Sequence, residues 1–564
     1  MKRPWGLVLT LVMIAMFEPT LTASSREHAR SMVVTQRGIV AASQTLASQA
    51  GAQILARGGS AADAAIAANA VLTVVEPMSN GIGGDLFAIR RDAATGEVTG
   101  LNASGWAPAK LTAELLRNRG HDGVPRLGIL SATVPGCVRG WAALHQRFGR
   151  LPWREVLQPA IYYAEHGFPV TEIIQEDWTN QVSKLSADDY AKAIFLPNGQ
   201  VPRVGEVFRN PDLAKALRLL AAEGADAFYE GEIARAILAT SSKLEGVFSA
   251  EDLAAYEAEW VEPVTTDYRG WKVYELPPNG QGIAALEMLN IMERFPLGEW
   301  RHDEPDTLHC KIEAQKLAYQ DLQRYVGDPR FARMPLDGLL SKDYAGRRAA
   351  LVKPDRAACD VAAGDPPGGS SDTIYLSAVD RDGNLVSLIQ SIYNAFGSGV
   401  AVPGYGFHLQ NRGALFTLEE GHPNELQPRK RPFHTIIPAL MERGARHVAF
   451  GIMGGYNQAQ AHAQFVSNVA DHGMNLQQAL EAPRFTKLTF GGCDLMIESR
   501  FPEATLEQLR ERGHELTVPG PYCSPVGGGQ AVMLDSDTGV KYGASSPRKD
   551  GAAVPEPDPY FAAK

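Results

Sequence analysis

Several long segments of the chain repeat apolar residues every three or four positions, as amphipathic helices do. One of them begins at Ser60, and Asp63 follows three residues later, which is the spacing of a capping box. Alanine-rich sequence continues this helix to about Val75. The same pattern predicts further helices over residues 140–148, 153–166, 210–223 and 305–326.

Apolar runs typical of strands are concentrated between residues 373 and 402. The first two runs, 373–379 and 385–391, are separated by a short polar segment that contains Asp382-Gly383. Asp-Gly between two strand-like runs indicates a tight hairpin turn. The sequence therefore predicts a β-hairpin over residues 373–391.

Two registers of this hairpin fit the sequence. A two-residue turn centred on Asp382-Gly383 would place Thr373 opposite Ile392. A three-residue loop, with Gly383 in the left-handed conformation, would place Thr373 opposite Ser391, with their Cβ atoms roughly 5 Å apart. We favour the second register, because it also brings a second hydroxyl group within reach of the Thr373 hydroxyl.

Helix-like and strand-like segments are mixed along the 564 residues, and residues 447–452 form a further strand candidate. This mixture predicts an α/β or α+β fold. The length exceeds that of one ordinary domain, but no Ser/Gly/Pro-rich linker and no internal repeat divides the chain. The formal net charge is −10, and the one short basic run, Arg429-Lys430-Arg431, is expected to shape a loop, so no nucleic-acid partner is predicted.

The five cysteines are scattered, odd in number and never spaced as Cys-x-x-Cys; they are Cys137, Cys310, Cys359, Cys493 and Cys523. This pattern speaks against a disulfide framework and against a zinc site. The thirteen histidines contain no His-x-x-x-His or His-Glu-x-x-His pair. The sequence therefore predicts no metal and no other cofactor.

The N-terminus has the layout of a secretory signal. Lys2-Arg3 precedes an apolar run over residues 5–17, and Leu21-Thr22-Ala23 fits a cleavage site. The run is too short for a spanning helix. Residues 1–23 are thus predicted to be a signal peptide, and the mature protein to be periplasmic or secreted without membrane contact. In the alternative, translation starts near Met32 and the protein is cytoplasmic.

Thr373 follows a loop-like segment over residues 366–371 and opens the first strand of the hairpin. A threonine hydroxyl is a poor nucleophile unless a base lies beside it, and the free amine of an N-terminal threonine is such a base. Cleavage of the bond between Asp372 and Thr373 would therefore make Thr373 a self-contained catalyst. The alternative interpretation is a loop followed by an ordinary strand.

The residues around Thr373 resemble the signature of the γ-glutamyltransferase (γ-glutamyltranspeptidase) family of N-terminal-nucleophile hydrolases. That signature runs Thr, small residue, His, any residue, Ser, then Gly-Asn or Gly-Ser, and later a hydroxyl residue and an aromatic-Gly pair. Ile374 and Tyr375 depart from the small residue and the histidine. The residues that match are Thr373, Ser377, Gly383-Asn384, Ser391 and Phe396-Gly397.

The resemblance covers nearly the whole chain from about residue 33. Any one of the shorter matching segments is weak, but together they occur in the family's order. The chain is therefore identified as a member of this family. The segments span residues 58–65, 75–77, 81–84, 134–136, 327–329, 430–432, 454–455, 482–485 and 542–545.

Membership implies a four-layer αββα sandwich that becomes a heterodimer by self-cleavage. Residues 33–372 would form the large subunit and residues 373–564 the small catalytic subunit, both in one intertwined unit that can pair into a dimer of heterodimers. The resemblance makes Thr373 the nucleophile and Ser391 its helper hydroxyl. It assigns the oxyanion hole to Gly454-Gly455, where missing side chains let amide N–H groups approach a substrate oxygen. The alternative for this pair is a tight turn.

The substrate-binding positions depart from those of the family's transferases. In those transferases an arginine holds the glutamyl α-carboxylate, and the corresponding position in this chain is Ser104. An aspartate holds the α-ammonium there, and the corresponding position here is Leu415. Burying an ammonium group without a partner costs free energy, so the loss of this aspartate should weaken the binding of a glutamyl group. Three further positions differ from the transferases. This chain has Arg412 where they have Gln or Glu, Tyr393 where they have Asn, and His434-Thr435 where they have a pair of serines.

These departures resemble the acylase-like branch of the family, which includes glutaryl-cephalosporin acylases and oxamate amidohydrolases. Their substrates carry a carboxylate but no α-amino group. Arg412 could hold such a carboxylate through two parallel hydrogen bonds. The alternative is that Arg412 pairs with a structural acid.

The sequence therefore predicts a self-processed threonine amidohydrolase, acting through an acyl-enzyme on Thr373. Its substrate would be a small amide whose acyl group is of the glutaryl, oxalyl or γ-glutamyl type. One alternative is a true γ-glutamyltransferase or glutathione hydrolase, and another is a non-catalytic scaffold of the same family. A dinucleotide enzyme is disfavoured, because residues 80–84 lack the full G-x-G-x-x-G pattern and its ribose-binding acid.

Overall fold

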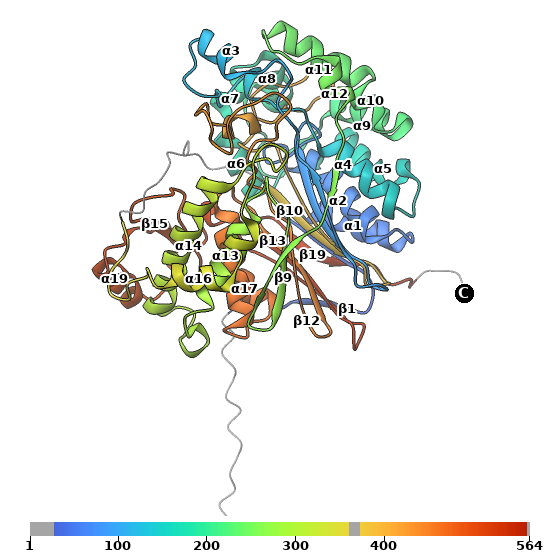
Figure 1. Cartoon of the computed structure of the whole chain (residues 1–564). Coiled ribbons are helices and arrows are strands. Elements are labelled where there is room, and N and C mark those ends of the chain that lie inside the picture. Colours follow the sequence, from blue (N-terminus) through green and yellow to red (C-terminus); the bar gives the residue numbers. More distant parts are fainter. Residues whose placement is uncertain (1–27, 360–372, 561–564) are drawn as a thin grey trace, which may run out of the picture.

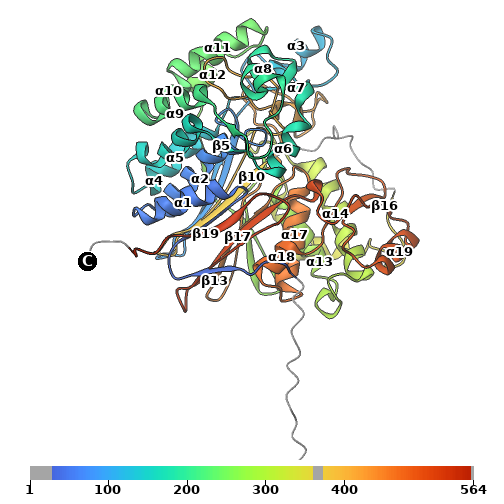
Figure 2. The same ribbon diagram turned by 180° about the vertical axis from the view of Figure 1, so that it is seen from behind.

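Two seven-stranded sheets lie face to face in the computed structural model, with helices against the outer face of each (Figure 1, Figure 2). The structure describes residues 28–359 and 373–560, so the predicted signal peptide, residues 1–23, lies outside it. The arrangement confirms the predicted αββα sandwich. None of the described helices is long and apolar enough to cross a bilayer.

The first sheet carries the predicted hairpin at its centre. The two strands of this hairpin are buried on both faces, which accounts for their almost continuously apolar sequences. All neighbouring strands in the sheet are antiparallel. Across the sheet they are β19 (Ala552–Pro555), β2 (Ile39–Ala42), β10 (Ile374–Val379), β11 (Leu385–Ser391), β3 (Asp85–Arg91), β4 (Val98–Ala103) and β7 (Glu259–Val261).

The second sheet is also antiparallel throughout. Side chains from the inner faces of both sheets form one buried cluster, in which the Tyr375 ring packs so closely on Gly451 that a Cβ atom there would lie 2.4 Å from the ring. The strand predicted over residues 447–452 is confirmed as β13. The strand order is β1 (Val33–Thr35), β18 (Lys541–Ser545), β17 (Gly529–Asp535), β13 (Arg446–Ile452), β12 (Ala439–Arg443), β9 (Trp271–Glu275) and β8 (Val264–Tyr268).

Helices α1 (Thr45–Ala56) and α2 (Ala61–Val75) cover the outer face of the first sheet. The predicted capping box is present, because Ser60 Oγ accepts from the Asp63 N–H and Asp63 accepts from the Ser60 N–H. Further helices extend this layer. They are α3 (Ala113–Asn118), α4 (Cys137–Phe148), α5 (Trp153–His166), α6 (Glu172–Thr179), α7 (Val182–Ser186), α8 (Asp189–Phe195), α9 (Pro211–Glu223), α10 (Asp226–Tyr229), α11 (Glu232–Lys243) and α12 (Ala250–Ala254).

A second helical layer covers the other sheet, and its central members pack through a separate apolar cluster. The helix predicted over residues 305–326 is observed as α14 with nearly the same bounds. These helices are α13 (Gly282–Met292), α14 (Pro305–Tyr325), α15 (Leu336–Leu339), α16 (Lys342–Ala349), α17 (Asn457–Ala470), α18 (Leu476–Glu481) and α19 (Glu503–Glu511). The small strands are β5 (Phe168–Pro169), β6 (Val207–Phe208), β14 (Phe485–Thr486), β15 (Asp494–Ile497) and β16 (Glu515–Thr517).

The prediction of β-structure as far as residue 402 was too long, because strand β11 ends at Ser391. Tyr393 and Phe396 have φ angles of 75° and 53°, and Gly397 has 53°. Left-handed backbone of this kind cannot continue a strand. The chain turns there instead and leads toward the short 3₁₀ helix η4 (Arg412–Leu415).

The expectation drawn from the cysteine pattern also needs correction. Cys359 and Cys493 form a disulfide across 134 residues of sequence. Local spacing could not reveal this pair, since the fold alone brings the two segments together. Cys137 and Cys310 are buried thiols, and Cys523 is a partly buried one.

Each of the two sheets combines strands from before and after Thr373. In the first sheet, the hairpin lies between β2 and β3, which come from the N-terminal half of the chain. In the second sheet, β1 lies beside β18, and β9 lies beside β12. Neither part of the chain therefore forms a complete sheet by itself.

Candidate active site

The hairpin has the register that brings Thr373 and Ser391 together. Ile374 lies opposite Gln390, and Gly383 has a φ angle of 89°. This confirms the three-residue loop and excludes the two-residue turn. The Thr373 hydroxyl donates to Ser391 Oγ across 3.4 Å, and both residues are buried.

The glycine-rich loop over residues 81–84 supports the end of β11. A Cβ atom on Gly84 would lie 2.4 Å from the Ser391 carbonyl oxygen, and Gln390 Nε2 donates to the Gly81 carbonyl across 2.7 Å. Only a residue without a side chain fits this close approach. The loop therefore serves to place Ser391, which accounts for its glycines without a dinucleotide site.

Gly454 and Gly455 lie between strand β13 and helix α17, beside Thr373. Their φ angles are 118° and 58°, so both adopt backbone conformations that favour glycine. Their amide N–H groups donate to no other group in residues 28–359 and 373–560. Gly454 and Thr373 line a common cavity of about 300 Å³. Free amides at the end of a buried strand suit the predicted oxyanion hole.

Gln281 holds the Gly454-Gly455 loop in place and was missed from the sequence. Its Nε2 donates to the Gly455 carbonyl across 2.7 Å and to the Thr435 carbonyl across 2.5 Å. A signal for it does exist, since the polar run Asn279-Gly280-Gln281 stands between an apolar strand and an apolar helix. Gln281 thus connects the loop at Gly455 with the segment that contacts Arg412.

Arg412 is fully buried and carries free hydrogen-bond donors. Its Nη1 donates to Thr435 Oγ1 across 2.7 Å, and its guanidinium lies 4.5 Å from the centre of the Tyr393 ring. Its Nε and Nη2 have no partner within the described residues, nor does it form an ion pair there. The alternative that Arg412 pairs with a structural acid is therefore not supported by the structure.

Burial lowers the pKa of Arg412 to about 10, which still leaves it charged at neutral pH. A buried cation with two unused N–H groups on one edge is costly unless an anion meets it. Nε and Nη2 form the edge of a guanidinium that accepts a carboxylate through two parallel hydrogen bonds. The free edge of the Arg412 guanidinium thus presents two donors with the spacing that a carboxylate requires.

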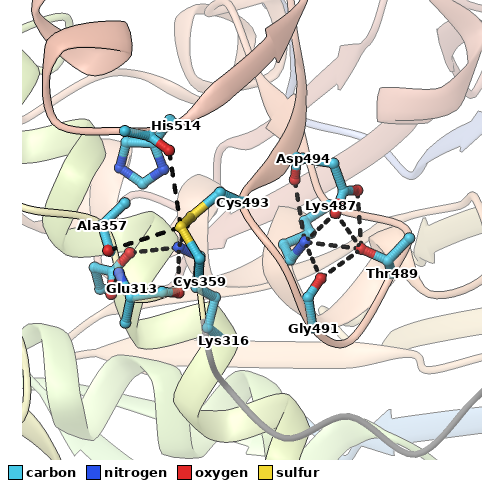
Figure 3. Close-up of a disulfide and its surroundings, with 12 residues drawn as sticks. Glu313, Lys316, Ala357, Cys359, Lys487, Thr489, Gly491, Cys493, Asp494 and His514 are labelled. Atoms are coloured by element: carbon cyan, nitrogen blue, oxygen red, sulfur yellow. Dashed lines mark hydrogen bonds and ion pairs between the residues drawn. A yellow bond between two sulfur atoms is a disulfide. The ribbon is translucent and has the colours of Figure 1, made fainter.

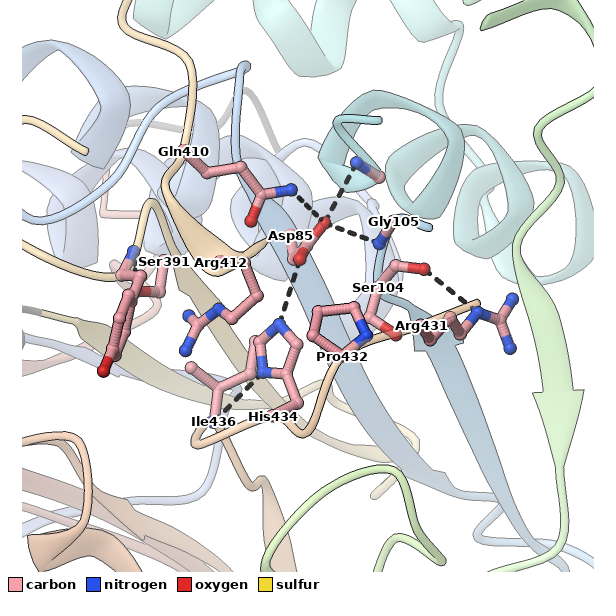
Figure 4. A network of polar contacts seen from close by, with 12 residues as sticks. Asp85, Ser104, Gly105, Ser391, Gln410, Arg412, Arg431, Pro432, His434 and Ile436 are labelled. Atoms are coloured by element: carbon pink, nitrogen blue, oxygen red, sulfur yellow. Dashed lines mark hydrogen bonds and ion pairs between the residues drawn. The ribbon is translucent and has the colours of Figure 1, made fainter. Parts of the chain in front are cut away.

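Asp85 and His434 lie next to Arg412, on the side away from Ser391 (Figure 4). His434 Nε2 donates to Asp85 Oδ2 across 3.0 Å, and His434 Nδ1 accepts from the Ile436 N–H across 3.3 Å. Burial, together with the charge of Arg412, lowers the pKa of His434 to about 4, so its ring is neutral. Both ring nitrogens are in use, which makes His434 a support for the neighbouring Thr435.

Ser104 forms its hydrogen bond away from the Arg412 donors, whereas Leu415 ends the 3₁₀ helix that Arg412 begins. Ser104 Oγ donates to Asn102 Oδ1 across 2.7 Å, and Figure 4 shows Ser104 beyond Asp85 as seen from Ser391. Leu415 lines a second cavity of about 340 Å³, together with aromatic side chains such as Tyr456. The predicted binding residues that the structure brings together are therefore Tyr393, Arg412, His434 and Thr435.

His309, Glu313 and His514 form the one group within the described residues that is close enough to hold a metal ion. Most of their polar atoms already have partners of another kind, and only His514 Nδ1 lacks one within the described residues. His309 Nδ1 lies 2.8 Å from His514 Nε2, and the Lys316 ammonium lies 2.7 Å from Glu313. Because the Lys316 ammonium already pairs with the Glu313 carboxylate, we interpret the two histidines and Glu313 as a buried hydrogen-bond network.

We expect Ser391→Ala to slow both chain cleavage and turnover. The substitution removes the hydroxyl that accepts the Thr373 hydrogen bond, and losing such a contact at a reacting group costs about 10- to 100-fold in rate. Cleavage is followed on reducing gels, and turnover with an amide substrate. Ser377→Ala is the matched control, because Ser377 is a buried hydroxyl of the same hairpin that lies opposite Ser387 rather than Thr373. Equal rates in both variants would remove Ser391 from the mechanism.

Comparison with known proteins places this site in a family. The family model described as gamma-glutamyltranspeptidase matches residues 47–556. The chain is 38% identical to the glutathione hydrolase-like YwrD proenzyme of Bacillus subtilis, over 93% of this chain and 99% of that protein. It is 37% identical to the acylase ACY 1 proenzyme of a Pseudomonas strain, over 92% and 93% of the two chains.

A solved structure of a related protein supports the same family assignment. The cephalosporin acylase of Bacillus halodurans superposes with a TM-score of 0.88 at 42% sequence identity, covering 96% of this chain and all of that one. Both halves of the sandwich, and not only the hairpin, are therefore shared. The protein belongs to the gamma-glutamyltranspeptidase family of N-terminal-nucleophile hydrolases.

Proposed function

We propose that this protein is a threonine amidohydrolase whose substrates are small amides with a carboxylate on the acyl group. The observation that carries this proposal is Arg412, a buried cation with two unpartnered N–H groups close to the Thr373–Ser391 pair. Tyr393 connects them, because its N–H donates to Ser391 Oγ across 2.8 Å and its ring lies against Arg412. The names of the relatives, an acylase and a glutathione hydrolase-like proenzyme, support amide cleavage by a processed chain.

The first step would be self-cleavage. The Thr373 hydroxyl attacks the Asp372 carbonyl carbon, the Asp372–Thr373 C–N bond breaks, and an ester forms while the Thr373 amine is released. Water then hydrolyses the ester, which leaves a carboxylate on Asp372 and restores the Thr373 hydroxyl. Asp372 itself lies outside the described residues. The products would be a large subunit that ends at residue 372 and a small subunit that spans residues 373–564.

The mature enzyme would then use Thr373 on its substrate. The Thr373 amine takes the hydroxyl proton, and Oγ1 attacks the substrate carbonyl carbon. The Gly454 and Gly455 amides stabilise the charge that develops on the carbonyl oxygen. The proton passes to the leaving amine as the C–N bond breaks, and water hydrolyses the acyl-enzyme ester.

A second candidate function, hydrolysis of γ-glutamyl amides, is favoured by one observation. Asp122 and Glu419 line the cavity beside Leu415 and could attract a substrate ammonium. Both acids are exposed, however, so water screens their charge. We therefore rank this function below one that uses the buried Arg412.

We predict that the matured enzyme prefers glutaryl or oxalyl amides over the matching γ-glutamyl amides. One charged hydrogen bond is worth about 1.5–3 kcal/mol, so a preference of roughly ten- to a hundredfold in kcat/KM is expected. The measurement compares a glutaryl anilide with a γ-glutamyl anilide. Arg412→Lys should reduce the preference, because an ammonium cannot reproduce the planar fork.

Arg484→Lys is the matched control for this test. Arg484 is another fully buried arginine with unpartnered nitrogens, but its Nη2 donates to the Gly527 carbonyl and it lies beside Glu498. Its replacement should leave the ratio of glutaryl to γ-glutamyl activity unchanged. A γ-glutamyl preference in the unaltered enzyme would replace our proposal by the glutathione hydrolase.

We also propose export of the protein. The basic and apolar pattern over residues 1–23 is that of a signal peptide, and a disulfide such as Cys359–Cys493 persists in oxidising compartments. Mature protein from a periplasmic or culture-medium fraction should begin after Ala23. N-terminal sequencing of that fraction tests this expectation, and recovery of the activity only from the cytoplasm would contradict it.

A further inference from the structure

Cys359 and Cys493 stand on opposite sides of the proposed cleavage point along the chain. Their disulfide has Cα atoms 4.8 Å apart, which lies within the usual range for such bonds. Cys359 comes from the predicted large subunit, whereas Cys493 directly precedes β15 in the predicted small subunit. Figure 3 shows the bond between these two parts of the fold, next to Lys316 and His514.

Backbone contacts hold the two cysteines together independently of the sulfur atoms. The Ala357 N–H donates to the Arg512 carbonyl across 2.7 Å, and the Gly492 N–H donates to the Cys359 carbonyl across 3.2 Å. Both contacts join residues from before the cleavage point to residues after it. The disulfide can therefore form in the folded chain without any rearrangement of either segment.

The surroundings leave one sulfur protected and the other accessible. Cys493 is 4% exposed, and the Lys316 ammonium lies 3.8 Å from its sulfur. The same ammonium pairs with Glu313 and donates to the Ala358 carbonyl across 3.0 Å, which fixes it beside the bond. Cys359 lies at the surface. A thiol reagent in solution therefore reaches the bond from the Cys359 side.

We propose that this disulfide joins the large and small subunits covalently, so that the mature enzyme is a cross-linked heterodimer. The proposal rests on the self-cleavage described above. Two thiols form the bond by losing two protons and two electrons, and a disulfide of a thiol oxidoreductase accepts both in a thiol–disulfide exchange. An exported protein meets such partners.

Covalent linkage would change how the mature enzyme behaves on dilution. Two separate chains associate according to their concentration, whereas two linked chains meet at a fixed effective concentration. The unfolding temperature of the cross-linked enzyme should therefore not depend on protein concentration. After reduction of the bond, it should fall as the protein is diluted.

Electrophoresis of the matured enzyme tests the proposal directly. The thiols are first blocked by alkylation, and the protein is run on denaturing gels with and without dithiothreitol. We expect one band near the size of the uncut chain without reductant, and two bands with it. Cys359→Ser should give two bands in both lanes. Cys523→Ser, which removes a thiol outside the disulfide, should behave like the unaltered enzyme.

The possible results separate the cross-link from the proposed function. Two bands from the unaltered enzyme without reductant would overturn the cross-link and leave self-cleavage intact. One band in both lanes would overturn self-cleavage, and the cross-link between subunits with it. Should Cys359→Ser fail to fold, the unaltered enzyme reduced after purification replaces it. Its unfolding temperature is then measured over a tenfold dilution, and no dependence on concentration would count against the cross-link.

Discussion

Thr373→Ala should leave the purified protein as one full-length chain without amidase activity. Alanine has no hydroxyl to attack the preceding carbonyl, so the Asp372–Thr373 bond stays intact. The protein then lacks both the nucleophile and the free amine that would activate it. Loss of a nucleophile typically reduces turnover by about 10⁴-fold or more. Reducing gels and mass spectrometry show whether the chain stays intact, and an anilide assay measures the loss of turnover.

Thr373→Ser is the matched control for this substitution. It keeps a hydroxyl at the same buried position beside Ser391, so it should still give a small subunit of roughly 20 kDa by length. N-terminal sequencing should place residue 373 first in that subunit. If Thr373→Ala still splits at the same bond, another protease makes the cut, and the assignment of Thr373 as a self-processing nucleophile fails.

Gly455→Ala should reduce turnover by about 10²–10³, the usual cost of losing one oxyanion donor. Gly455 has a φ angle of 58°, which an alanine adopts only at a cost in backbone energy. Relief of that strain would turn the peptide and move its N–H away from the substrate oxygen. Because the contact forms in the transition state, kcat should fall while KM changes little.

Gly444→Ala is a close control, since Gly444 also has a φ angle of 58° but lies in the open turn between β12 and β13. Both variants introduce the same strain, and only one places it beside Thr373. We expect Gly444→Ala to lower the unfolding temperature without changing kcat. Equal kcat values in the two variants would mean that the loop at Gly455 stabilises no charge.

Local patterns in the sequence predicted the hairpin between Thr373 and Ser391 well. Asp-Gly between two apolar runs, together with a glycine able to adopt a positive φ, determines the turn and hence which residue faces Thr373. The capping box at Ser60 and the helices over residues 153–166 and 305–326 follow from equally local rules. Such features depend on neighbours in the chain, which the sequence displays.

Features that depend on distant segments could not be predicted in this way. Cys359 meets Cys493 only because the small sheet folds against α14, and no spacing rule reports that contact. The free donors of Arg412 are another case, since the absence of an acid partner shows only once the surrounding residues are in place. Resemblance to the family supplied Arg412 as a candidate but neither cysteine, and the fold decides what each side chain contacts.

Because each sheet combines strands from both parts of the chain, cleavage changes how well the protein can refold after denaturation. An uncut chain can fold again after denaturation, because all strands of both sheets remain connected in one order. A cut chain that unfolds must reassemble its sheets from two pieces, each with unpaired strand edges that favour aggregation. Refolding of the mature enzyme after denaturation should therefore be slower and lower in yield than refolding of the uncut chain, even when the Cys359–Cys493 disulfide keeps the two pieces together.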